Sequence, residues 1–134
     1  MRIQKLREEI AKVDWSSFNG PSMYDAKAVP LALYSLIDLD NSSKAEAVGN
    51  MLISALGNNH AGVYYPVVLK ALDYIIAVAN CGSNDISKIC ALAVLNDLYY
   101  FEPEVEGFST CAADELKEAV LEKLSLQLDG LTDA

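Results

Sequence analysis

Two short segments of the 134-residue chain combine side chains suited to binding or catalysis. The first is 58–66, where two asparagines, one histidine and two tyrosines lie close together, and its candidate contact residues are His60, Tyr64 and Tyr65. Tyrosine is enriched at protein interfaces because its ring has a large area, few rotatable bonds and a polar tip. The segment predicts a partner-binding loop. The alternative is that the two tyrosines fasten a loop between helices.

The second segment, 97–106, interleaves aromatic rings with carboxylates. Its candidate contact residues are Asp97, Tyr99, Tyr100, Glu102, Glu104 and Glu106. Such a pattern suits a lysine- or arginine-rich partner, because it offers ion pairs and cation–π contacts together. The alternative is a buried helix end followed by a solvated acidic loop.

Catalytic and metal chemistry has little support in the sequence. His60 is the only histidine, which excludes a multi-histidine metal cluster and a two-histidine relay. The three cysteines match neither zinc-binding nor paired-disulfide spacing, and nothing local favours a Cys–His catalytic pair, although it stays open. Segment 38–49 begins like a calcium loop, but Ser43 replaces the required glycine and Gly49 the required glutamate. We expect no metal, no cofactor and no enzymatic activity.

The acidic charge is concentrated at one end. The net charge is −9, and residues 96–134 carry ten acidic residues against Lys117 and Lys123. Direct nucleic-acid binding is not expected, because phosphates require a basic surface. An acidic surface steers a basic protein partner towards it; the alternative is that it only keeps the protein in solution.

The sequence pattern predicts neither a membrane span nor an export signal. No run of eighteen apolar residues suggests a membrane span, and the first residues lack the apolar core of a signal peptide. We expect a cytoplasmic protein that does not contact membranes.

The elements that must position these residues are helices. Apolar residues recur at helical spacing in six stretches, separated by glycine, proline and asparagine. We therefore expect a single all-α domain over 1–134. The stretch 85–101 is apolar on most sides, which predicts a central helix covered on both flanks. The expected helices are 3–13, 25–39, 43–56, 63–79, 85–101 and 113–128.

Two of the predicted hairpins share an apolar pattern. An offset of 39 places Leu33 on Leu72, and an offset of 42 after the turn places Leu52 on Val94; Asn41 aligns with Asn80. A period of about 40 residues is typical of HEAT-class solenoids, in which hairpins stack because one alone cannot bury its apolar face. This predicts an α-α superhelix of about three HEAT-like hairpins. Its concave surface would be lined by helices 43–56 and 85–101. The alternative is chance agreement between two amphipathic hairpins.

Three motifs lie in the stretch 43–104, about half of the chain: His60-Ala61-Gly62, Tyr65-Pro66 and Phe101-Glu102-Pro103-Glu104. On these motifs, the stretch resembles bacterial HEAT-like repeat proteins. Some proteins of that kind are encoded beside polymorphic or contact-dependent toxins and serve as their immunity proteins. The resemblance implies a cytoplasmic immunity protein that occludes the active surface of a basic toxin domain, with no catalytic residue carried over. The alternative is a general scaffold or adaptor.

Overall fold

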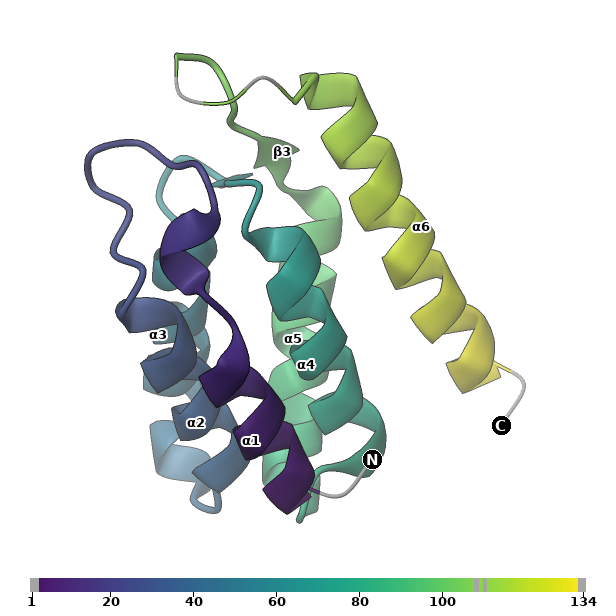
Figure 1. The fold of residues 1–134 in the computed structure, drawn as a ribbon. Helices are drawn as coiled ribbons and strands as arrows, with labels where there is room; N and C mark the ends of the chain where they lie inside the picture. The colour runs from purple at the N-terminus through teal and green to yellow at the C-terminus, as the bar shows by residue number, and fades with distance from the viewer. Residues whose placement is uncertain (1–2, 108, 110, 133–134) are drawn as a thin grey trace.

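The computed structural model describes residues 3–107, 109 and 111–132, and this part of the chain is mainly helical, as predicted. Each predicted stretch overlaps one α-helix. Among the described residues, no helix is both long and apolar enough to cross a membrane. The helices (Figure 1) are α1 (Ile3–Lys12), α2 (Ala28–Asp38), α3 (Ala45–Leu56), α4 (Val68–Cys81), α5 (Asp85–Tyr100) and α6 (Ala113–Thr132), with short 3₁₀ helices η1 (Trp15–Ser17) and η2 (Ser42–Lys44).

Two helices begin later than predicted, for local reasons. Helix α2 begins at Ala28, because Asp25 caps a separate turn by accepting a hydrogen bond from the Lys27 amide at 3.1 Å. Helix α4 begins at Val68, because the residues before Pro66 are paired in a strand instead. The remaining helix ends lie within a few residues of the predicted ones.

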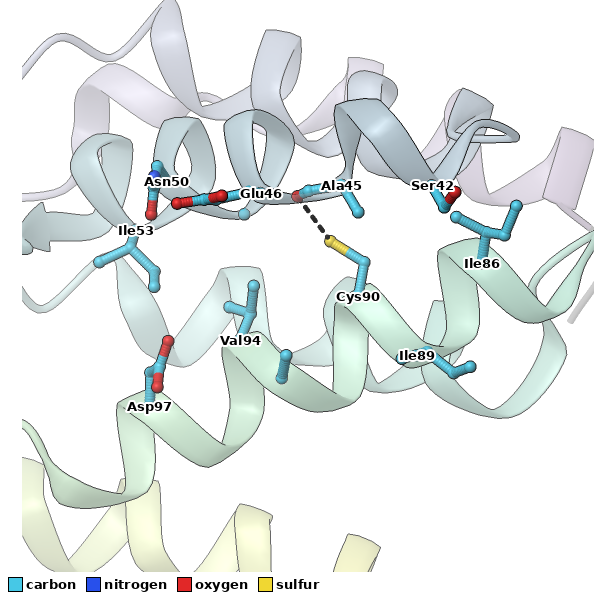
Figure 2. A pocket seen from close by; sticks show the side chains of 12 residues that line it. Ser42, Ala45, Glu46, Asn50, Ile53, Ile86, Ile89, Cys90, Val94 and Asp97 are labelled. Atoms are coloured by element: carbon cyan, nitrogen blue, oxygen red, sulfur yellow. Dashed lines mark hydrogen bonds between the residues drawn. The ribbon is translucent and has the colours of Figure 1, made fainter.

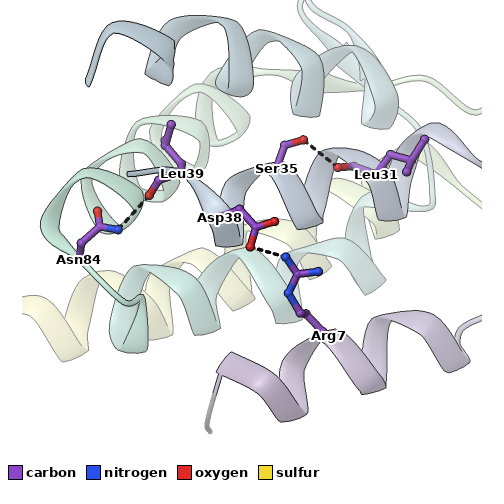
Figure 3. Close-up of polar contacts among 6 residues, drawn as sticks. All are labelled: Arg7, Leu31, Ser35, Asp38, Leu39 and Asn84. Atoms are coloured by element: carbon purple, nitrogen blue, oxygen red, sulfur yellow. Dashed lines mark hydrogen bonds and ion pairs between the residues drawn. The ribbon is translucent and has the colours of Figure 1, made fainter. Parts of the chain in front are cut away.

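The helices form two hairpins that lie side by side. Helix α2 pairs with α3 and α4 with α5, while α2 adjoins α4 and α3 adjoins α5. Helix α1 covers α2 and α4, and the Arg7 side chain forms an ion pair with Asp38 at the end of α2 (Figure 3). Helix α6 packs against α4 and α5 on the opposite flank (Figure 1).

The aligned positions of the two hairpins have the same structural role. Leu33 and Leu72, and likewise Leu52 and Val94, are all buried in one continuous apolar core. Burying each such side chain contributes about 1.5–3 kcal/mol, so the stack is held mainly by shared apolar burial. The common pattern read from the sequence therefore marks the common buried face.

Asn84 joins the turns of the two hairpins, whereas the sequence alignment had paired Asn41 with Asn80. Asn41 caps η2, with its Oδ1 accepting from the Ser43 amide at 2.9 Å. Its counterpart is Asn84 rather than Asn80, which lies inside α4; Asn84 Oδ1 accepts from the Ser87 amide at 3.0 Å. Asn84 Nδ2 also donates to the Leu39 carbonyl at 2.9 Å, which links the second turn to the first (Figure 3).

A small three-stranded sheet is present that the sequence pattern did not predict. Strands β1 (Gly57–Asn58) and β2 (Val63–Tyr64) pair antiparallel, and β2 pairs parallel with β3 (Glu102–Pro103). Gly57 allows the close approach, since a Cβ there would lie 2.0 Å from the Val63 carbonyl oxygen. The sheet ties the chain leaving α5 to the loop that follows α3.

Replacing Asn84 by alanine should test the link between the turns. We expect Asn84→Ala to lower the free energy of unfolding by about 2 kcal/mol, because it removes a helix cap and a hydrogen bond between hairpins, each contributing about 1 kcal/mol. Asn41→Ala is the matched control and should lose about 1 kcal/mol, because it removes a cap, together with an exposed hydrogen bond from the Ser43 hydroxyl, but no bond between hairpins. Urea unfolding measures both, and equal losses would contradict the proposed link.

Candidate functional site

The sheet brings the two predicted binding segments together. The Glu102 amide donates to the Gly62 carbonyl at 2.9 Å, and the Glu104 amide donates to the Tyr64 carbonyl at 2.8 Å. Segments 58–66 and 97–106 therefore lie side by side, although they are about 40 residues apart in sequence. The sequence predicted them as separate candidates and contained no signal for their pairing.

Tyr64 and Tyr65 do not belong to the binding surface. Their exposed fractions are 0% and 3%, so neither ring has an area to present to a partner. The Tyr65 ring packs edge-on against Tyr24, with centroids 6.3 Å apart, and the Tyr65 amide donates to the Leu56 carbonyl at 2.8 Å. This corrects the prediction that both tyrosines contact a partner. They fasten the loop, which was the alternative interpretation.

The buried tyrosines are kept neutral by their surroundings. Burial raises the pKa of Tyr64 and, less strongly, that of Tyr65, with the charges of Glu102 and Glu104 adding to the respective shifts. Burial, with the charge of Asp25, raises the pKa of Tyr24 to about 12. These hydroxyls therefore pack within the structure as uncharged groups at neutral pH.

The second segment presents its side chains to solvent. Tyr100 is 73% exposed and Tyr99 is 40% exposed, and their rings meet edge-on with centroids 5.1 Å apart. The four carboxylates around them are exposed as well. We call this surface the acidic end; it comprises Asp97, Tyr99, Tyr100, Glu102, Glu104 and Glu106.

Helix α6 holds the acidic end in place through Lys117. The Lys117 ammonium donates to the carbonyls of Tyr99, at 3.3 Å, and Phe101, where α5 ends. A cation is favoured there because the carboxyl end of a helix carries partial negative charge. Lys117 Nζ also lies 3.6 Å from a Glu102 carboxylate oxygen, so it offsets part of that charge. No ion pair to another described residue involves Asp97, Glu104 or Glu106.

His60 lies in a separate, shallow hollow of about 660 Å³. Met23, Ser54 and two asparagines share the lining, and none of the described lining residues is a cysteine or a carboxylate. Cys90 is buried and Cys81 is exposed on another part of the surface. Among the described residues, no group of three or more His, Cys, Asp or Glu side chains is placed to hold a metal ion. His60 is exposed at this hollow, and its contact with a partner stays a prediction.

A groove runs between α3 and α5 (Figure 2). The sequence predicted the two helices that border it but not the residues that line it. The groove has a volume of about 370 Å³ and a mainly apolar lining, and Asp97 is the predicted site residue among those that line it. The prediction that helices 43–56 and 85–101 line a common surface agrees with this position. That prediction followed from the stacking of repeated hairpins. Across the groove, the Cys90 thiol donates to the Ala45 carbonyl at 3.5 Å.

Comparisons of the chain with protein-family models, with curated proteins and with solved structures find no match. The likeness to HEAT-like immunity proteins therefore stays a prediction from its motifs. The functional argument rests on the surfaces described above.

Removing the Tyr64 hydroxyl should not destabilise the fold. This buried oxygen has no hydrogen-bond partner among the described residues, and burying such a group without a partner is unfavourable. We expect Tyr64→Phe to raise the free energy of unfolding by about 1 kcal/mol at pH 7. In Tyr24→Phe, the control, a hydroxyl that donates to the Trp15 carbonyl at 2.7 Å is lost, so stability should fall by about 1 kcal/mol. Denaturant titration measures the free energy of unfolding of both variants. An equal loss of stability in Tyr64→Phe and Tyr24→Phe would refute this explanation.

The same tyrosines predict a loss of stability in alkali. The native pKa of Tyr24, about 12, lies above the ordinary value of 10.0, so the unfolded state releases this proton first. The contribution of Tyr24 to the free energy of unfolding should be constant below pH 10 and be lost as the pH rises towards 12. Unfolding titrations at several pH values should show a shallower fall for the Tyr24→Phe/Tyr64→Phe double variant. An unchanged slope in that variant would argue against the assignment.

Proposed function

We propose that this chain is a cytoplasmic immunity protein that binds a basic toxin domain and covers its active surface. The observation that carries the proposal is the acidic end, where the exposed Tyr99–Tyr100 pair stands among exposed carboxylates. Aromatic rings provide contact area and cation–π attraction for arginine and lysine, while carboxylates add charge-assisted hydrogen bonds. The surface therefore suits a cationic protein.

The proposal includes the architecture. We infer that the hairpins α2–α3 and α4–α5, together with α6, belong to a HEAT-like α-α superhelix. Support comes from the contacts between like helices and from the burial of the aligned positions. In such a stack, the hairpins provide a stiff frame, so the acidic end reaches a partner already ordered.

A toxin is the partner class that best explains an acidic inhibitor. Toxins that attack nucleic acids need basic clefts, since their substrates are polyanions. An acidic protein complements such a cleft and is steered into it, which speeds association when inhibition must be prompt. The inhibitor acts by occupying the cleft and performs no chemistry of its own.

Charge reversal at the acidic end should slow association. For the triple variant Glu102→Lys, Glu104→Lys, Glu106→Lys, we expect the association rate constant with the toxin domain encoded upstream to fall by about tenfold or more, and the rate of the unaltered protein to fall as salt rises. Stopped-flow or biosensor kinetics would measure both.

A matched variant separates local charge from net charge. Glu8, Asp40 and Glu122 are also exposed, and reversing these three to lysine changes the net charge equally. Association of this control should stay within about twofold of the unaltered protein at moderate salt. Equal slowing by the two triple variants would move the interface away from the acidic end.

Co-expression tests the inhibitory role itself. Cells that produce the upstream toxin domain should grow when the unaltered chain is present and should lose protection when the acidic end is reversed. Growth that is no better with the chain than without it would sink the immunity proposal. Binding without protection would instead indicate a scaffold or adaptor.

A further inference from the structure

The groove between α3 and α5 has the dimensions and repeat of a helix-binding surface. Its lining recurs at helical spacing along both helices, with Ala45, Gly49 and Ile53 on α3 and Ile86, Ala93 and Asp97 on α5. The α5 side runs from Ile86 to Asp97, so its eleven residue-to-residue steps rise about 16 Å at 1.5 Å each, which is about three turns. Ridges of a third helix can sit between two helices that lie side by side.

The floor of the groove is open because small residues line it. A Cβ built on Gly49 would lie 3.7 Å from Val94 and 3.8 Å from the Cys90 sulfur, which is ordinary contact distance rather than a clash. Ala45 (Figure 2) and Ala93 add only methyl groups to the lining. The apolar wall is nevertheless uncovered, since Ile89 is 65% exposed.

The charge at the edges of the groove has one sign. Glu46 and Asp97 line it from opposite helices, and none of the described residues that line it is basic. Neither carboxylate forms an ion pair with another described residue. Tyr100 follows Asp97 by three residues on α5, so the two lie on neighbouring turns of one helix face and the acidic end adjoins the groove.

We propose that this groove binds an amphipathic helix of the partner, about three turns long, with an apolar stripe flanked by lysine or arginine. The stripe covers Ile86 and Ile89, and the basic side chains pair with Glu46 and Asp97. The inference deepens the proposed function and rests on it, because it names the kind of segment by which a basic partner is held.

The charges argue against other occupants. A second copy of this chain, with a net charge of −9, would place like charges beside Glu46 and Asp97. An anionic lipid surface would be repelled for the same reason. A basic helix alone satisfies both the apolar floor and the acidic edges.

Synthetic peptides test the groove without the natural partner. The probe is a fluorescein-labelled peptide of about 14 residues made of leucine and lysine, with leucines on one helical face; glutamate replaces lysine in the matched peptide. By fluorescence anisotropy, the lysine peptide should bind about tenfold or more tightly than the glutamate peptide. Equal affinities would overturn the proposal.

Blocking the groove is the second arm of the experiment. Ala93→Trp fills it from an exposed position, and Ala47→Trp places the same bulk on an exposed position of α3 outside the lining. Lysine-peptide affinity should fall about tenfold in Ala93→Trp and stay unchanged in Ala47→Trp, with circular dichroism melts confirming that both fold. Equal affinity for both variants would overturn the proposal, as would sedimentation showing a dimer that only Ala93→Trp dissociates.

The toxin domain separates this inference from the proposed function. If reversal of the acidic end slows association but Ala93→Trp binds normally, the groove inference fails and the immunity proposal stands. If Ala93→Trp weakens toxin binding about tenfold and also reduces protection, both are supported. If Ala93→Trp blocks the lysine peptide while unaltered protein gives no protection, the groove stands and the immunity proposal fails.

Discussion

Helix α5 is apolar on more sides than a single neighbour can cover, and the arrangement of the other helices follows from that constraint. Helix α4 covers one side of α5, α3 covers another, and α6 closes part of the remaining flank. Val94 and Leu98 are buried beneath these neighbours, whereas Ile89 is 65% exposed, so the side of α5 that carries Ile89 is not covered. Because the stack leaves that stripe of α5 open, a groove forms beside α3. The burial that stabilises the fold and the surface that we propose for a partner therefore share one helix.

The end of α5 shows how a few backbone hydrogen bonds give an acidic segment a defined position. Two amides of segment 102–104 donate to the loop after α3, and Lys117 binds the last carbonyls of α5. Without these bonds, the carboxylates would lie on a free loop and a partner would have to order them at an entropic cost. With them, Tyr100 and its neighbouring carboxylates are held next to the groove. The acidic end and the groove then form one extended surface on which a basic protein can be bound.

The helices and the shared hairpin pattern could be predicted because they rest on local periodicity. Leu33 and Leu72 are equivalent in both sequence and burial. The apolar residues on most sides of 85–101 predicted that α5 packs against several other helices. The sheet could not be predicted, since strands of two residues show no alternation and their pairing is set by tertiary contacts. For the same reason Tyr64 and Tyr65 were misassigned: composition suggests an interface, but burial decides whether a ring is available. Asn84 was missed because the alignment matched residue types, whereas capping depends on where a helix begins.

Amide hydrogen exchange of the chain, free and bound to the proposed toxin partner, tests most directly whether the acidic end is the partner surface. The account predicts slower exchange on binding at residues 97–106 and in the loop 58–62, with further protection along α3 and α5 beside the groove. Protection confined to α1 and the face of α2 that it covers, with 97–106 unchanged, would contradict it.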